Sequence, residues 1–291
     1  MGSERSFLRD LAGARVGKCV DERFDLDGLL GLGATGAVYS ALDRESGDRV
    51  AIKLIHDGLS RSPDIVRRFL REARTTSAID HPAVIRVFGF GRDAEGHLYQ
   101  VSELLRGEPL TAAVVDGSLT VEDTIAIGRA LLSALEAAHG KNIVHRDVKP
   151  DNVFLSRDEH GSPWVKLLDF GIAKTFDSDE TWDTVDGLVI GTPHYMSPEQ
   201  CLGEVVDART DLWSLGAVLF HAVLGRPPFH ADDLGQLLLE IVRERAPSMT
   251  ELRPDLPTGF TTCVDRALEP SRSLRWQTAR DMANALTAPE W

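Results

Sequence analysis

The residues best suited to chemistry lie in one short stretch near the middle of the chain, at positions 143–152. The stretch reads IVHRDVKPDN and offers the carboxylate of Asp147, the ammonium group of Lys149 and the amide of Asn152. A carboxylate can take the proton of a hydroxyl nucleophile, a lysine can offset the charge of a phosphoryl group, and oxygen ligands suit a hard metal ion. The order of these groups therefore indicates a loop for phosphoryl transfer.

Rigid elements are expected on both sides of this loop. Before it, an apolar stripe at helical spacing predicts a helix that begins after Thr120 and ends at Gly140. After it, short apolar runs predict two strands, 153–155 and 164–168, with a turn near Gly161 between them. The stripe of the helix consists of Ile125, Leu131, Leu132, Leu135 and Ala138.

A glycine-rich hairpin is predicted in the first part of the chain. Gly31, Gly33 and Gly36 follow a strand-like run, and residues 37–42 read as a second strand rather than as a helix. The same glycine spacing in a dinucleotide-binding fold lies between a strand and a helix, so a Rossmann turn is disfavoured. Glycines at a hairpin tip let backbone amides approach phosphate oxygens without an intervening Cβ. The alternative is a plain glycine-rich hairpin.

A lysine stands inside an apolar strand, Lys53 within residues 49–55. Such a lysine is costly to bury unless a carboxylate pairs with it. The next element begins as a helix should, with Pro63 in its first turn, and runs to about Ala78. Glu72 lies beside the apolar stripe of this helix, and we expect it to pair with Lys53. The alternative is that Glu72 is one more exposed acid among several arginines.

Composition limits the class of protein. The chain has 291 residues, of which 43% are apolar and 26% charged, as is typical of a soluble globular domain. The formal charge of −13 argues against nucleic acid as a partner and leaves basic peptide segments as targets. Three dispersed cysteines indicate a reducing compartment, so we expect a cytoplasmic protein. The longest apolar stretch, 212–225, is too short to form a membrane segment.

The motifs follow one another in the order known from one enzyme family, and over roughly residues 20–287 the chain resembles the eukaryotic-type (Hanks-type) serine/threonine protein kinase domain, in its bacterial branch. Ser197 stands where the family usually has alanine, a small change. The motifs, in chain order, are Gly31/Gly33/Gly36, Lys53, Glu72, His145-Arg146-Asp147, Asn152, Asp169-Phe170-Gly171 and Ser197-Pro198-Glu199.

The resemblance implies an α+β fold with two lobes. A small five-stranded β lobe with one main helix would span about residues 21–104. A larger, mostly helical lobe would span about residues 106–287. Residues 1–20 would form a loose N-terminal extension, and residues 288–291 a C-terminal tail.

Two structural features of the larger lobe are also implied. The apolar run that starts at Asp211 looks like the start of the buried central helix of this lobe. Arg275 looks like the late arginine of the family that pairs with the glutamate of the Ser197-Pro198-Glu199 triplet.

The resemblance further implies roles for single residues. Asp147 would accept or orient the proton of the substrate hydroxyl, and Lys149 would offset the charge of the γ-phosphate. Lys53, held by Glu72, would position the other phosphates of ATP. The metal ligands, for Mg²⁺ or alternatively Mn²⁺, would be Asn152 and Asp169. The remaining nucleotide contacts would be Leu30, Gly31, Gly33, Gly36, Val38, Ala51, Glu103, Leu105 and Phe154.

The polar segment between Asp169 and Glu199 is the expected switch. Arg146 could pair with a phosphate there, and we expect autophosphorylation of Thr181 or Thr184. The alternative is that these threonines are ordinary loop hydroxyls. Thr192 would instead help to hold the catalytic Asp and Lys.

Protein substrates with Ser or Thr, and a homodimer formed through the small lobe, complete the expectation. A pseudokinase would have lost Lys53, Asp147, Asn152 or Asp169, and none is lost. A small-molecule kinase of the same fold is disfavoured by the intact glycine-rich flap, by Lys149 and by the Ser-Pro-Glu triplet.

Overall fold

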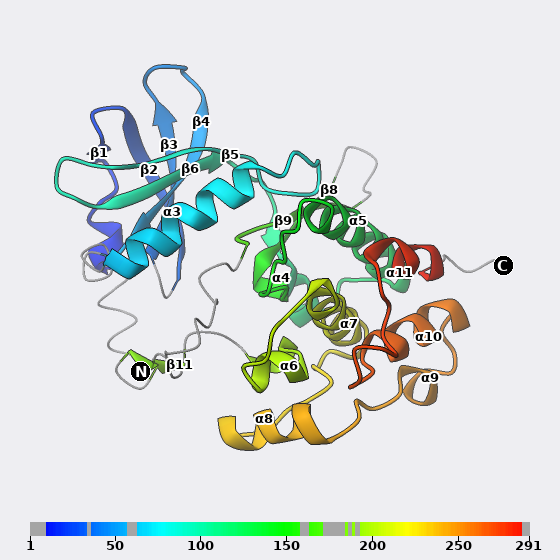
Figure 1. The fold of residues 1–291 in the computed structure, drawn as a ribbon. Coiled ribbons are helices and arrows are strands. Elements are labelled where there is room, and N and C mark those ends of the chain that lie inside the picture. The colour runs from blue at the N-terminus through cyan, green and yellow to red at the C-terminus, as the bar shows by residue number, and fades with distance from the viewer. Residues whose placement is uncertain are drawn as a thin grey trace. The chain divides into compact units, whose positions relative to one another are not determined.

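The computed structural model describes residues 10–33, 36–56, 63–157, 163–170, 184–185, 188–189 and 193–286. The chain divides into two compact units. Unit 1 consists of Met1–Asp80 and Ile85–Arg106, and unit 2 consists of His81–Val84 and Gly107–Trp291. Figure 1 labels the helices and strands of both units, and shows that unit 1 is built around a sheet whereas unit 2 is mostly helical.

The sheet of unit 1 has six antiparallel strands in the order β1-β2-β3-β4-β6-β5. The prediction of five strands was therefore wrong by one. The additional strand, β1, is only two residues long, so no alternation of apolar and polar residues announces it. The strands are β1 (Cys19–Val20), β2 (Phe24–Leu32), β3 (Gly36–Asp43), β4 (Arg49–Ile55), β5 (Val87–Arg92) and β6 (Leu98–Glu103).

The register of this sheet puts four of the predicted nucleotide contacts on one face. Val38 in β3 lies opposite Gly31 in β2 and opposite Lys53 in β4. Ala51 lies two residues before Lys53 and is opposite Ser102 in β6. Directly paired residues point to the same side of a sheet, and side chains alternate along each strand. Gly31, Val38, Ala51 and Lys53 therefore share a face.

Helix α3 (Pro63–Ser77) packs on the same face. Phe69 of α3 forms a small buried cluster with Ile55 and Leu98 of the sheet, and Ile55 lies two residues beyond Lys53. The helix begins at the predicted proline and ends one residue before the predicted end.

The opposite face of the sheet is covered by the N-terminal segment. Ala12 and Val20 are buried in one cluster with Tyr39 and other apolar residues of the strands. The hydroxyl of Tyr39 donates a hydrogen bond of 3.0 Å to the carbonyl of Ala12. The expectation that this segment is loose was wrong for residues 10–20, because tertiary contacts hold it where local pattern gives no signal.

In unit 2, helix α5 (Val121–His139) begins as predicted. The hydroxyl of Thr120 accepts the N–H of Asp123 at 3.0 Å, and the Asp123 carboxylate accepts the N–H of Thr120 at 3.4 Å, which is a capping box. Gly140 is the C-cap. The other helices are α4 (Leu110–Val115), α6 (Pro198–Cys201), α7 (Ala208–Leu224), α8 (Leu234–Arg243), α9 (Met249–Leu252), α10 (Thr258–Ala267) and α11 (Ala279–Ala285).

Helix α7 forms the centre of unit 2, where it contacts α5 and α10 (Figure 1). Every residue from Thr210 to Phe220 is buried. The helix is followed by the C-cap Gly225, whose φ of +68° lies in the left-handed region that glycine adopts without strain. The prediction of a buried central helix is confirmed.

Small strands complete unit 2. The strands predicted after the loop are present as β8 (Val153–Arg157) and β9 (Pro163–Leu167), which join β7 (Glu108–Pro109) in one sheet. A second, two-stranded sheet pairs β10 (Thr184–Val185) with β11 (Leu188–Val189).

Among the residues that the structure describes, no helix combines the length and the hydropathy needed to cross a bilayer.

Candidate active site

The three chemical groups of the central loop lie together in unit 2. The Nζ of Lys149 is 2.9 Å from Oδ2 of Asp147. Asn152 donates through Nδ2 to the same Oδ2 at 3.0 Å and to the backbone carbonyl of Asp147 at 2.8 Å. The side chains of Asp147 and Lys149 are 16% and 15% exposed, so both still reach solvent. One oxygen of a partly accessible carboxylate is thus fixed by two donors.

The donor set next to Asp147 suits a hard cation. Because its nitrogen is used on Asp147, Asn152 presents its amide oxygen as the group left to ligate. Its backbone carbonyl accepts the N–H of Leu168 at 2.8 Å, and Leu168 directly precedes Asp169. This bond links the backbones that carry the two predicted metal ligands. An amide oxygen and a carboxylate are ligands that Mg²⁺ and Mn²⁺ accept.

A buried carboxylate from α7 holds the loop. Asp211 is fully buried and accepts the backbone N–H groups of His145 and Arg146, each at 2.8 Å. A third bond of 2.8 Å joins Asp211 to Nε2 of His139, at the end of α5. Arg146 has a φ of +68°, which is a strained conformation for a residue with a Cβ. The bonds to Asp211 hold this conformation, and with it the position of Asp147.

His145 is a neutral, structural ring. It is fully buried, and burial lowers its pKa. Its Nδ1 accepts the N–H of Asp147 at 3.2 Å, so the proton belongs to Nε2, which donates to the carbonyl of Leu168 at 3.0 Å. Phe170, also buried, packs on this ring with centroids 4.5 Å apart. His145 therefore ties the catalytic loop to the residues on either side of Asp169.

A buried ion pair anchors the segment after this site. Arg275 donates two hydrogen bonds to Glu199, of 2.8 and 2.9 Å, and Thr210 donates a third of 2.7 Å. Burial alone would raise the pKa of Glu199, but the bonds and charge of Arg275 outweigh it and leave the pKa below the ordinary value. The guanidinium also lies 4.7 Å from the ring centre of Trp213. The predicted pairing of Arg275 with Glu199 is confirmed.

In unit 1, the glycines have a structural role in the hairpin, independent of any ligand. The N–H of Gly33 donates to the carbonyl of Gly36 at 2.8 Å. A Cβ on Gly36 would lie 2.1 Å from the carbonyl oxygen of Leu54, whereas one on Gly31 would meet nothing within 4 Å. Gly36 is thus required by the pairing of β3 with β4, and Gly31 keeps open space at the sheet face shared with Lys53.

The other predicted nucleotide contacts are divided between the units. Leu30 is 53% exposed in unit 1, where Ala51 is buried. Glu103 uses its N–H and its carboxylate on the backbone of Arg86, at 3.0 and 2.7 Å. Leu105 follows β6 in unit 1, and Phe154 lies in β8 of unit 2. Their contact with a nucleotide remains a prediction.

Several predicted residues fall outside what the structure describes. Thr181 and Thr192 are not among the described residues. For Glu72 and Thr184, only the backbone is described, in α3 and β10.

Two residues that hold the loop, Asp211 and His139, were not predicted from the sequence to do so. A signal was available for Asp211, because a carboxylate at the start of an otherwise apolar helix must find donors if it is buried. No sequence pattern pointed to His139.

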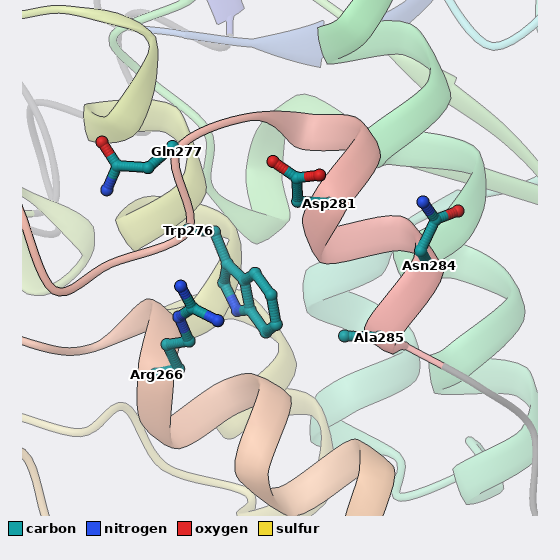
Figure 2. Close-up of a pocket in the computed structure, with 6 residues that line it drawn as sticks. All are labelled: Arg266, Trp276, Gln277, Asp281, Asn284 and Ala285. Carbon is teal, nitrogen blue, oxygen red and sulfur yellow. The ribbon is translucent and has the colours of Figure 1, made fainter.

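A surface pocket of about 420 Å³ lies elsewhere in unit 2, at α10 and α11 (Figure 2). Arg266 lies over the ring of Trp276, 4.0 Å from its centre, and Asp281 faces the same space. None of its lining residues belongs to the predicted site, so we do not assign the chemistry to it. The lining residues are Arg266, Trp276, Gln277, Asp281, Asn284 and Ala285.

Known proteins that are similar in sequence to this chain are protein kinases. A family model described as "Protein kinase domain" matches residues 24–286. The chain is 37% identical to serine/threonine-protein kinase pkn2 of Myxococcus xanthus, over 92% of this chain and 32% of that protein. It is 34% identical to serine/threonine-protein kinase PknA of Mycobacterium tuberculosis, over 94% of this chain and 63% of that protein. The chain therefore spans from about a third to just under two thirds of the length of these relatives.

Solved structures of similar fold include a kinase domain of the same type. The crystal structure of the Mycobacterium tuberculosis PknI kinase domain matches with a TM-score of 0.72 at 27% identity, over 93% of this chain and 97% of that one. The structure of Rad53 1-466 in complex with AMP-PNP matches with a TM-score of 0.72 at 27% identity, over 90% of this chain and 64% of that one.

Proposed function

The chain belongs to the protein kinase family as a serine/threonine kinase domain of the bacterial Hanks type, and on this premise we propose that it transfers the γ-phosphate of ATP to Ser and Thr hydroxyls of proteins. The observation that carries the proposal is the constellation around Asp147. Its carboxylate is fixed by Lys149 and Asn152, on a loop that a buried carboxylate holds in place.

Asp147 orients the substrate hydroxyl and takes its proton. Its Oδ2 already accepts Asn152 and Lys149, so the carboxylate has a fixed direction and needs little reorganisation when a hydroxyl approaches. Lys149 brings a positive charge to the same place and offsets the charge of the phosphoryl group during transfer. Positioning and charge together supply the rate, because this reaction asks for little covalent chemistry from the protein.

The divalent metal is Mg²⁺, with Mn²⁺ as the alternative, and Asn152 and Asp169 are its ligands. When bound, the ion neutralises charge on the phosphate oxygens. Lys53 holds the other phosphates with Glu72 as its partner. Gly31, Gly33 and Gly36 allow the hairpin backbone to approach them. Support for ATP comes from the family and from the nucleotide analogue bound to the Rad53 structure.

Regulation is part of the proposal. Thr181 or Thr184, on the segment that follows Asp169, is phosphorylated, and the phosphate forms an ion pair with Arg146 beside Asp147. Thr192 helps to hold Asp147 and Lys149. The protein acts in the cytoplasm on protein substrates and forms a homodimer through its small lobe. A reducing compartment agrees with three cysteines in which no disulfide spacing is seen.

The intact mass of the protein after incubation with Mg-ATP tests the reaction. The wild type should gain whole phosphate groups, and Asp147→Asn should gain none in the same time, since an amide cannot take the proton. A decrease of about 10²-fold or more in rate is expected. Mapping of the modified residues then tests Thr181 and Thr184.

Two controls make the result decisive. Asp151→Asn changes a neighbouring, exposed carboxylate of the same loop and should leave the mass gain in place. Nucleotide binding by both Asp variants shows that each is folded. Equal mass gains in the wild type and Asp147→Asn would contradict the assigned role, and no transfer to itself or to a basic test peptide would contradict the function.

A further inference from the structure

Three histidines, His194, His221 and His230, lie together in unit 2, and we call them the histidine cluster. His194 belongs to the 3-10 turn η3 (Pro193–Tyr195), and His221 lies in the last turn of α7. The rings of His194 and His230 are stacked, with centroids 5.6 Å apart and planes 21° apart. Tyr195 stacks on His221 with centroids 6.0 Å apart, and its hydroxyl lies 2.6 Å from Nδ1 of His221.

The contacts of two rings in the cluster, His194 and His221, favour their uncharged forms. Burial raises the pKa of the Tyr195 hydroxyl, so the phenol keeps its proton and donates it to Nδ1 of His221. Nδ1 of His194 is buried and has no hydrogen-bond partner among the described residues. Burial lowers the pKa of both His194 and His221. Electrostatic repulsion between His194 and His230 lowers the pKa of His194 further, and repulsion from His194 acts in the same way on His221.

The surrounding charges do not reverse this preference. Asp151 of η1 (Pro150–Asn152) and a hydrogen bond with the backbone of Gly225 favour the protonated form of His221, but burial outweighs them. Helix α8 also packs on η3. Its titratable residues, Glu240 and Arg243, are not among the groups that shift the pKa of His194 or His221.

The turn that carries His194 and Tyr195 is connected to the catalytic loop. Ser214 of α7 donates to the carbonyl of Tyr195 at 2.8 Å, and Trp213 donates to the carbonyl of Met196 at 2.9 Å. A few residues further on, Gln200 donates to the carbonyl of Arg146 at 2.8 Å. Arg146 precedes Asp147. A displacement of the turn therefore has a direct route to the residue that takes the proton.

We propose that the histidine cluster is a proton-sensitive positioning device that keeps η3 and the catalytic loop in the arrangement needed for phosphorylation of a protein substrate. The inference rests on the kinase reaction proposed above. Protonation of His194 puts a donor at a buried Nδ1 that has no acceptor among the described residues, and it places a charge beside the ring of His230. The turn moves to relieve both effects. Kinase activity then falls as the medium becomes acidic.

The direction follows from linkage. The pKa of His194 and of His221 in the packed turn is below the ordinary value of 6.5. A displaced turn, whose rings are hydrated, binds more protons than the packed one once the pH falls below about 6.5. The packed arrangement is therefore favoured above that pH and loses stability below it.

The test compares kcat/KM for a Ser-containing peptide with fixed charge at about pH 7.5 and about pH 5.5, at saturating Mg-ATP. His194→Phe keeps a ring for the stack on His230 and cannot bind a proton. His221→Asn keeps an acceptor for the Tyr195 hydroxyl and cannot titrate in this range. On acidification, kcat/KM of the wild type should fall by a factor at least about threefold larger than that of either variant. The difference can reach about tenfold, because one proton changes an equilibrium by at most tenfold over one pH unit.

The variants remove the contribution of the cluster to the pH dependence of kcat/KM. The contributions of Asp147 and of the peptide to that pH dependence stay unchanged. His97→Gln, a histidine of unit 1, should keep the full acid sensitivity of the wild type. Direct binding of Mg-ATP should not change between the two pH values. If both cluster variants lose activity in acid as steeply as the wild type does, the inference is wrong. Absence of any transfer at about pH 7.5 would instead contradict the proposed function itself.

Discussion

At the scale of single residues, the position of one carboxylate is fixed by two different kinds of contact. Lys149 and Asn152 hold the side chain of Asp147 from within the loop, and Asp211 holds the backbone that precedes it from within the core. Fixed donors contribute to catalysis because they do not have to reorganise when charge moves. The side chains that we propose to act and the side chains that support them are thus different, and mutation can separate their contributions.

Lys149→Met tests the acting side chain. The substitution keeps an unbranched side chain and removes the charge, so kcat should fall by about 10²-fold or more while the KM for ATP changes by less than about threefold. Steady-state kinetics with a peptide substrate measure both. Lys141→Met, at an exposed lysine just after α5, is the matched control and should leave kcat unchanged. A raised KM for ATP with normal kcat would mean that Lys149 serves binding and not the chemical step.

The sequence indicated the group of Asp147, Lys149 and Asn152, but it did not indicate the contact between Asp211 and His139 that holds the loop. Asp147, Lys149 and Asn152 lie within six positions of each other, so their order alone indicates a chemistry. Asp211 and His139 are 72 positions apart and meet only after α5 and α7 have packed. Their contact depends on tertiary structure, which local spacing does not encode.

At the scale of elements, the short helix α6 and the long helix α7 are joined by Glu199, Thr210 and Arg275. The guanidinium of Arg275 is fully buried and also donates to the carbonyls of Glu269 and Pro270, at 2.6 and 2.9 Å. A buried charge whose partner is removed keeps its full desolvation cost. The pair is therefore expected to matter through the penalty of breaking it.

Arg275→Met should reduce the free energy of unfolding by about 3–5 kcal/mol, because it leaves Glu199 buried without its partner. Adding Glu199→Gln should restore part of the loss, since the stranded charge is then gone. Denaturant unfolding at neutral pH measures the three variants. Arg272→Met is the control, because Arg272 pairs with the half-exposed Glu204 at 3.2 Å and should cost about 1 kcal/mol or less. Equal losses for the two arginines would contradict the argument.

The elements predicted best were those with strong periodicity. Helix α5 has its cap, stripe and terminal glycine in the sequence, and the structure has all three. The N-terminal segment was expected to be loose because no sustained helical or strand period runs through residues 10–20. Ala12 and Val20 are nevertheless buried, since the sheet offers an apolar face that needs covering. Tertiary contacts rather than local propensity decide such short segments.

At the scale of the whole molecule, the main electrostatic feature is a large negative net charge. A formal charge of −13 on 291 residues gives a negative field that attracts cationic segments and repels acidic ones. This field acts over about one Debye length, which is ~10 Å at 0.1 M salt and shorter at higher salt. The preference for a substrate should therefore include a component that depends on ionic strength.

A Ser-containing peptide flanked by lysines should show a KM that rises several-fold when salt is raised from about 0.05 to about 0.5 M, because screening weakens the attraction. The same peptide flanked by glutamates should show a KM that falls or stays constant. Initial-rate assays at fixed Mg-ATP measure both. Parallel rises in KM for the two peptides would mean that salt acts on the enzyme and not on the encounter.

Gly36 has a consequence for how such sequences are interpreted. A side chain at this position would overlap the carbonyl of Leu54, whether or not a nucleotide is bound. A descendant of this domain that had abandoned ATP could relax the requirement at Gly31, where space is open, yet would still be held to glycine at position 36 by its own sheet. Retention of this third glycine is therefore poor evidence for an active enzyme. Its replacement would point to a rebuilt hairpin, and not merely to a lost substrate.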